Sequence, residues 1–194
     1  MASIALFHSA LGVRAGVTDA AARLRTAGHT VLVVDQYGGR VFDDYETAGA
    51  HVEQLGFPAL MQAALEAVAQ LPDGFVAAGF SNGAGMAEHV ATQRRCAGVL
   101  LFSGALPVAV LGADAWPAGV PVQLHVAARD PFAQPEWAEG FVADVRGSGS
   151  AVEVFEYPVG GHLFTDPGLP DEYDGPATAL LWERALAFCD RVTG

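Results

Sequence analysis

Residues 75–86 read FVAAGFSNGAGM, which is an apolar run followed by the pattern Gly-x-Ser-x-Gly and then by a helix-like run. This order predicts a strand, a sharp turn at Ser81 and a helix. Gly79 and Gly83 flank the serine because a Cβ at either position would collide with the neighbouring strand or helix. The turn pushes the Ser81 hydroxyl beyond the sheet edge, where the first amides of the helix face it. We therefore interpret Ser81 as a candidate nucleophile; the alternative is an ordinary turn with a capping serine.

Short apolar runs alternate with helix-like stretches along the whole chain. Most of the expected strands are apolar on both faces, which favours a parallel sheet covered by helices on both sides. The sequence predicts a three-layer αβα sandwich, with a mostly parallel sheet of about six strands, formed by one domain over residues 1–194. Strands are expected at residues 3–8, 30–34, 75–80, 98–103, 122–127 and 152–157, the last at a sheet edge. Helices are expected at residues 13–27, 47–71 with a break near 56–58, 82–94, 135–146 and 177–192.

Composition limits the classes of partner. The net charge of −12 argues against binding nucleic acid or an anionic membrane surface. Cys96 and Cys189 lie far apart, show no metal or redox spacing, and suit a reducing compartment. The N-terminal residues lack the basic and long apolar regions of a signal peptide or membrane span. We expect a cytoplasmic protein with a small-molecule partner and no metal site.

Residues that could activate Ser81 follow it in the order Ser81, Asp130, His162. A serine hydroxyl needs a base within hydrogen-bond reach, and that base needs an acid to orient it. Asp130 follows the strand at 122–127, and His162 follows the last strand after Gly160-Gly161, which we expect to let the ring swing towards the serine. Because the carboxyl ends of parallel strands meet at one edge of a sheet, the three side chains should converge there.

Other titratable residues are weaker candidates. Asp114 lies in a loose loop and Asp144 in a helix, where a solvated role is expected. His8 ends the first strand and is expected near the site without acting as the base. The remaining histidines are expected to pack or to face solvent: His29, His51, His89 and His125.

An oxyanion that forms at the substrate needs two backbone amides aimed at one point. One amide is expected from Asn82, directly after the nucleophile. The other is expected from the loop after the first strand, where Ala10 is the candidate.

With these residues in place, the chain resembles the dienelactone hydrolase family of the α/β-hydrolases, as a variant with a serine nucleophile. The resemblance covers nearly the whole length, including residues 7–14, 34–37, the turn at Ser81, 128–132 and 161–166. It implies the α/β-hydrolase fold, no cofactor and no large lid domain.

Three positions depart from the family pattern. Ser81 stands where these enzymes typically have cysteine, and Ser9 stands where they have a glutamate that partners it. Asp166 stands where they have an arginine for the substrate carboxylate, so we expect it to repel an anion. Together with the acidic composition, this favours a neutral or cationic ester, lactone or thioester. The expected substrate-binding residues are Ser9, Tyr37 and Phe132, with Phe42 and Trp116 as further pocket candidates.

The sequence thus predicts a serine hydrolase that cleaves a small ester or lactone. Two alternatives stay open: an acyltransferase with the same three residues, and a catalytically silent binding protein of the same fold. Either a monomer or a homodimer is compatible with the sequence.

Overall fold

The computed structural model describes residues 1–194 and contains one six-stranded sheet. The strands are β1 (Ser3–Phe7), β2 (Thr30–Val34), β3 (Phe75–Phe80), β4 (Cys96–Phe102), β5 (Val122–Ala127) and β6 (Val152–Tyr157). Their order is β2-β1-β3-β4-β5-β6, and every neighbouring pair is parallel. The chain builds outward from β1 to β2 and then from β3 to β6, so the order reverses between β1 and β3. Such a reversal opens a crevice at the carboxyl ends of the two strands.

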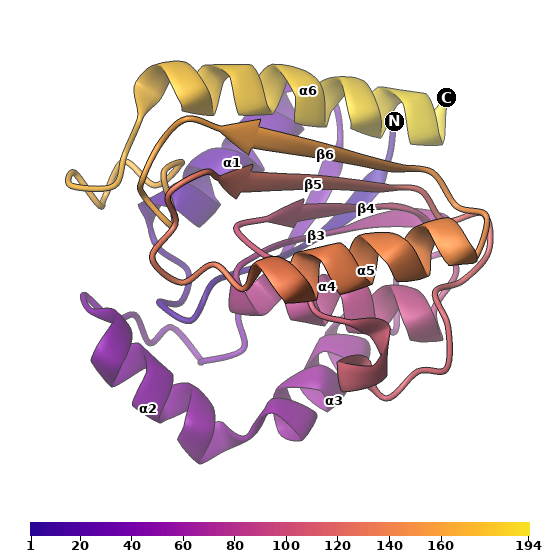
Figure 1. Cartoon of the computed structure of the whole chain (residues 1–194), viewed down its shortest axis with the longest axis horizontal. Helices are drawn as coiled ribbons and strands as arrows, with labels where there is room; N and C mark the ends of the chain where they lie inside the picture. The colour runs from indigo at the N-terminus through magenta and orange to yellow at the C-terminus, as the bar shows by residue number, and fades with distance from the viewer.

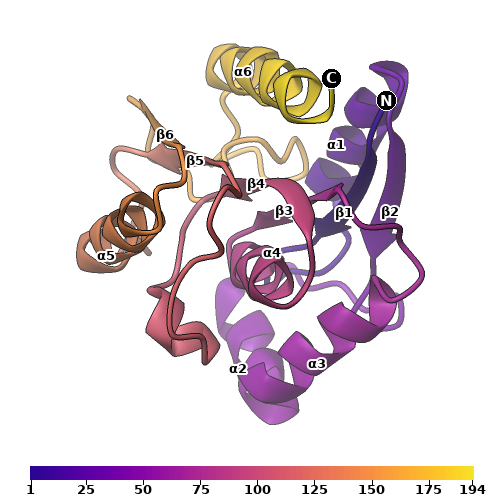
Figure 2. The same ribbon diagram turned by 90° about the vertical axis from the view of Figure 1, so that its right-hand side faces the viewer.

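Helices cover both faces of the sheet, which confirms the predicted three-layer sandwich (Figures 1 and 2). Helices α1 and α6 pack on one face, and α3, α4 and α5 on the other. The helices are α1 (Ala15–Thr26), α2 (Tyr45–Leu55), α3 (Phe57–Ala67), α4 (Asn82–Gln93), α5 (Pro135–Gly147) and α6 (Gly175–Thr193), with a 3-10 turn η1 (Val108–Leu111). Two hydrophobic clusters, one on each face, form the core.

The predicted break in the stretch 47–71 is confirmed at Gly56. This residue ends α2 and begins α3 with φ 81° and ψ 132°, a left-handed region that favours glycine. Helix α2 starts earlier than predicted because the Asp44 side chain accepts a hydrogen bond from the Thr47 amide and caps it. Only Ala48 of α2 is buried, and the helix lies apart from the sheet, beyond its carboxyl edge (Figure 1).

A buried polar network links β5 to β6. The His125 ring lies 2.8 Å from the Tyr157 hydroxyl through Nδ1 and 2.9 Å from the Gln123 carbonyl oxygen through Nε2. The Gln123 amide nitrogen donates to Glu153, so its oxygen faces the ring and His125 must carry its proton on Nε2. Burial, and after it the Arg184 charge, lowers the pKa of His125 to about 3. His125 is therefore a neutral packing residue, as predicted.

No helix in the structure combines the length and the apolar character that crossing a membrane would require.

Candidate active site

Ser81 occupies the turn between β3 and α4 with φ 52° and ψ −114°. It is one of two non-glycine residues in the chain with a positive φ, and such a conformation costs about 1–3 kcal/mol. A Cβ on Gly79 would collide with the backbone of Gly83, and one on Gly83 would lie 2.6 Å from the Phe7 carbonyl oxygen. The two glycines are therefore needed for close backbone contact, for the physical reason that the sequence indicated.

Three side chains from three loops form a continuous hydrogen-bond chain. His162 Nε2 lies 2.7 Å from Ser81 Oγ, and His162 Nδ1 lies 2.6 Å from Asp130 Oδ2. The other oxygen of Asp130 accepts the Phe132 amide at 2.8 Å, which fixes the carboxylate. Because an ionised carboxylate only accepts, Nδ1 carries the proton and Nε2 is free to accept from the serine hydroxyl. The side chains of His162 and Asp130 are only 7% and 5% exposed, so water screens this pair little.

The two predicted oxyanion amides lie on neighbouring backbone segments. The end of β1 packs against the first turn of α4, because Gly83 touches the carbonyls of Phe7 and His8. Asn82 is the first residue of α4, where amides have no partner within the helix. The Ala10 amide also donates to no group of the chain. The structure thus leaves both amides free to bind an oxyanion.

His8 holds the loop that carries Ala10. Its Nδ1 donates to the Ser9 carbonyl at 2.7 Å, and its Nε2 accepts the Gln36 amide at 3.1 Å. These two bonds require the neutral ring, and burial lowers the pKa of His8 accordingly. His8 therefore braces the loop, and its ring hydrogen-bonds to neither Ser81 nor Asp130.

The expected substrate-binding residues lie at different depths. Phe132 is 48% exposed and packs its ring 5.1 Å from that of His162, so it lies at the mouth of the site. Tyr37 packs against His8, its hydroxyl is buried, and burial raises its pKa to about 12. Ser9 is buried, and its hydroxyl accepts the Leu11 amide. Phe132 is the most exposed of the three.

Two of the further pocket candidates, Trp116 and Phe42, lie in the core instead. Trp116 does not line a pocket: it is buried in the core against Phe141, and its indole nitrogen donates to Val120. Asp144 is exposed, as expected, and its carboxylate accepts the Val108 amide at the start of η1. Phe42 is also buried, in the cluster on the α1 side of the sheet.

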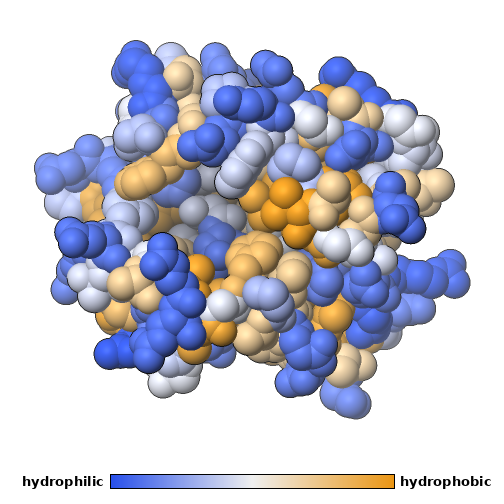
Figure 3. Space-filling view, turned by 60° about the horizontal axis from the view of Figure 1, so that its bottom comes forward, coloured by the Kyte–Doolittle hydropathy of each residue, from blue (hydrophilic) through white to orange (hydrophobic).

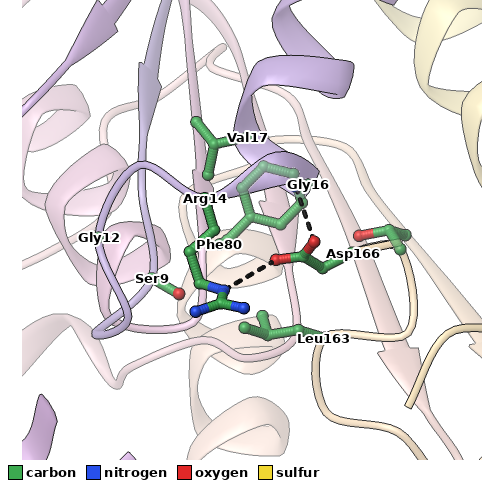
Figure 4. Close-up of a pocket in the computed structure, with 9 residues that line it drawn as sticks. Ser9, Gly12, Arg14, Gly16, Val17, Phe80, Leu163 and Asp166 are labelled. Atoms are coloured by element: carbon green, nitrogen blue, oxygen red, sulfur yellow. Dashed lines mark hydrogen bonds and ion pairs between the residues drawn. The ribbon is translucent and has the colours of Figure 1, made fainter. Parts of the chain in front are cut away.

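Asp166 is not a free charge that faces the substrate. It is 5% exposed and accepts the amides of Gly16 and Gly168, each at 2.8 Å, while the Arg14 guanidinium lies 3.7 Å away (Figure 4). A Cβ on Gly16 would lie 2.7 Å from the Asp166 Cβ, so a glycine is needed there. The predicted repulsion of anions by Asp166 is therefore corrected: its charge is paired inside the loop, where it ties residues 14–16 to the segment after His162.

Sequence reasoning missed Tyr45, Ser103 and Glu172. The Tyr45 ring lies 5.8 Å from His162 and 4.7 Å from Phe132, and the other two residues bond to the segment that carries His162. Tyr45 stood outside the predicted helix, and neither Ser103 nor Glu172 belongs to a recognisable motif. No group of three or more His, Cys, Asp or Glu side chains could hold a metal ion.

The sheet order, the turn at Ser81 and the hydrogen-bond chain together define an α/β-hydrolase with a serine at the strand-to-helix turn. Comparison with family models matches residues 1–193 to the dienelactone hydrolase family. The chain belongs to this family, and the protein is accordingly a carboxylic ester hydrolase.

Solved structures show the same fold. A protein described as m3DLH is 24% identical with a TM-score of 0.80, over 99% of this chain and 87% of that one. The dienelactone hydrolase-like promiscuous phosphotriesterase P91 from metagenomic libraries is 22% identical with a TM-score of 0.82, over 100% of this chain and 87% of that one. Alpha/beta hydrolase domain-containing protein 10 from mouse is 12% identical with a TM-score of 0.73, over 98% and 90%. A comparison with curated proteins found no match.

Proposed function

We propose that this hydrolase cleaves a small carboxylic ester or lactone through an acyl-enzyme formed on Ser81. The observation that carries the proposal is the unbroken hydrogen-bond chain from Asp130 through His162 to Ser81. A serine hydroxyl becomes an effective nucleophile when a neutral imidazole accepts its proton as it attacks.

The geometry supports the following acylation step. Ser81 Oγ attacks the carbonyl carbon while His162 Nε2 takes the hydroxyl proton, and Asp130 stabilises the imidazolium that forms. The amides of Asn82 and Ala10 hold the oxyanion, each contributing about 3 kcal/mol in the transition state. The intermediate collapses when the bond from the acyl carbon to the leaving oxygen breaks, and His162 gives its proton to that oxygen.

Deacylation repeats the same steps with water. His162 takes a proton from water as the water oxygen bonds to the acyl carbon. The bond from that carbon to Ser81 Oγ then breaks, the proton returns to the serine, and the carboxylic acid leaves. In a lactone both products stay in one molecule, as a hydroxy acid.

The surroundings favour an uncharged or cationic substrate. Aromatic rings of Tyr45 and Phe132 lie beside His162. The face drawn in Figure 3 also carries an apolar patch from its centre to its right, with polar side chains around it. Arg14 donates to the Gly168 carbonyl in the segment after His162, and its charge is paired with Asp43 and Asp166. A substrate carboxylate would therefore have to compete with these two carboxylates for Arg14.

A panel of p-nitrophenyl esters and small lactones tests the proposal. We expect Ser81→Ala to lower kcat/KM at least about a thousandfold, because the acyl-enzyme can no longer form. The matched control is Ser148→Ala. It removes a hydroxyl at the C-terminal end of α5, whereas Asp130 precedes the N-terminal end of that helix, and it should keep wild-type activity. Full activity of Ser81→Ala on any ester that the wild type hydrolyses would refute the proposed mechanism.

Two further measurements separate the alternatives. A fluorophosphonate probe should label Ser81 of the wild type, whereas folded protein that is not labelled would favour a binding function. Adding an alcohol to the assay and quantifying the products distinguishes hydrolysis from acyl transfer, since a transferase forms the new ester in preference to the acid.

A further inference from the structure

His162 lies between β6 and α6 in residues 158–174, a segment without helix or strand. A segment of this kind has no ladder of backbone hydrogen bonds to fix its side chains, so other contacts must do so. The bond from His162 to Ser81 depends on such contacts, because a displacement of the base by about 1 Å can lower the reaction rate about a hundredfold.

One peptide unit of this segment is held from both sides. The carbonyl of His162 accepts a hydrogen bond from Ser103 Oγ at 2.5 Å. The amide of Leu163 donates to Glu172 Oε2 at 2.7 Å. The carbonyl and the amide belong to the same peptide plane, which is rigid. Fixing that plane fixes the backbone on the carboxyl side of the His162 Cα, and with it the direction in which the imidazole leaves the chain.

Ser103 reaches the carbonyl through a strained backbone. It directly follows β4, is buried, and has φ 64°, the second positive φ of a non-glycine residue in the chain. Its amide donates to the His125 carbonyl at 2.8 Å, so the strand ends hold it in place. A glycine would adopt this conformation without strain but would lack the hydroxyl. Strain that is kept at a site beside the catalytic machinery points to a use for that side chain.

Glu172 is held by a second element. Its Oε1 accepts the Tyr45 hydroxyl of α2 at 2.8 Å. Burial, and after it the Glu172 carboxylate, raises the pKa of Tyr45, which keeps the hydroxyl a donor. Gly161 makes room for the acid, since a Cβ there would lie 2.7 Å from the Glu172 Cα. Gly161 thus serves close packing rather than the loop freedom that the sequence suggested.

We infer that Ser103 and Glu172 are positioning residues for His162, which act together by clamping the peptide between His162 and Leu163, with Tyr45 orienting the acid. The inference rests on the proposed role of His162 as the general base. The side chains of Ser103 and Glu172 hydrogen-bond to this peptide, and neither hydrogen-bonds to Ser81 or Asp130, so both act through the backbone of the histidine. The clamp should therefore affect the chemical step rather than the binding of substrate.

Steady-state kinetics on an ester that the wild type hydrolyses test the clamp. We expect Ser103→Ala and Glu172→Ala each to lower kcat about 10- to 100-fold with KM within about twofold of wild type. Glu172→Gln keeps an oxygen for the Leu163 amide and should recover kcat to within about threefold. Glu66→Ala, which removes an exposed carboxylate of α3, is the matched control and should not change kcat.

Two more variants separate positioning from stability. Ser103→Gly relieves the strained φ and should unfold at a temperature at least as high as Ser103→Ala, yet be as slow in kcat. The double variant Ser103→Ala/Glu172→Ala should lose less than the product of the two single losses, because both residues hold one peptide. If Glu172→Ala does not fold, Ser103→Gly and Glu172→Gln still carry the test.

The outcomes are distinct from those for the proposed function. Wild-type kcat in folded Ser103→Ala or Glu172→Ala overturns the clamp, and so does a Glu172→Gln variant as slow as the alanine variant. If the loss of kcat in the double variant equals the product of the two single losses, the two residues do not act on one shared peptide. An inactive Ser81→Ala beside a normal Ser103→Ala would reject the clamp alone, whereas an active Ser81→Ala would reject the mechanism itself.

Discussion

Two serines follow the carboxyl ends of central strands with strained backbones, Ser81 after β3 and Ser103 after β4. The first is recognisable in the sequence because glycines at 79 and 83 mark the tight turn around it. The second is followed by Gly104 but belongs to no such pattern, and its own amide is held by the His125 carbonyl. At the scale of single residues, a pattern therefore reveals a site only where local sterics demand particular residues.

Gly83 allows a direct test of this close packing. We expect Gly83→Ala to destabilise the protein by about 1–3 kcal/mol and to lower esterase activity, since its Cβ would press on the carbonyls of Phe7 and His8 and displace the Ala10 loop. Chemical denaturation and ester hydrolysis measure the two effects. The matched control is Gly49→Ala in α2, which meets no atom within 4 Å and should be neutral or stabilising. Equal stabilities of the two variants would contradict the packing argument.

At the scale of elements, caps connect the helices to the loop that carries His162. The Asp174 side chain accepts the Ala177 amide at 2.8 Å and so caps α6, while its own amide donates to the Phe164 carbonyl at 2.9 Å. Thr178 donates its hydroxyl to the same carbonyl at 3.0 Å. The first turn of α6 thus supports the loop at Phe164, which is two residues after His162.

The cap gives a prediction for α6. We expect Asp174→Ala to lower the free energy of unfolding by about 1 kcal/mol, which corresponds to a fall in Tm of about 2–4 °C for a chain of this size. Asp174→Asn keeps a side-chain acceptor and should stay within about 1 °C of wild type. Thermal unfolding followed by circular dichroism compares the two. A Tm of Asp174→Ala equal to that of wild type would show that the cap does not stabilise the helix.

The molecule as a whole buries several titratable groups, and His125 is the clearest case for linkage to pH. The pKa of His125 is about 3 in the folded protein and about 6.5 when unfolded, so the unfolded chain binds the extra proton first as pH falls. His125 therefore contributes stability that is fully present above about pH 6.5 and is lost as pH falls towards 3. The loss amounts to about 1.4 kcal/mol per pH unit in that window.

Replacing this ring should flatten the acid side of the stability curve. We expect His125→Gln to be less stable than wild type at pH 7 but to lose stability more slowly between pH 6 and 4. His8, whose pKa burial also lowers, remains in both proteins and contributes equally to both curves. Urea denaturation at several pH values measures the slopes. Parallel curves for the two proteins would show that His125 is not the linked group.

The sequence alone determined the class of fold and the three residues of the hydrogen-bond chain. Apolar runs that alternate with helical stretches admit few arrangements, and parallel strands bring their carboxyl ends to one edge, which is where Ser81, Asp130 and His162 meet. The break at Gly56 was also predictable, since a glycine with a proline two residues later marks a helix end in the local sequence.

Only the tertiary structure decided which polar side chains support that site. Asp166 stands where the family typically has an arginine. Its charge is paired with Arg14 and two backbone amides, and the spacing of residues in the sequence does not reveal this pairing. Trp116 and Phe132 are both loop aromatics, and their burial differs because of what packs around them. Ser103 follows β4 and Glu172 precedes α6, yet both hydrogen-bond to the peptide between His162 and Leu163. Side-chain hydrogen bonds of this kind depend on distances of about 3 Å between distant segments, which periodicity and composition do not encode.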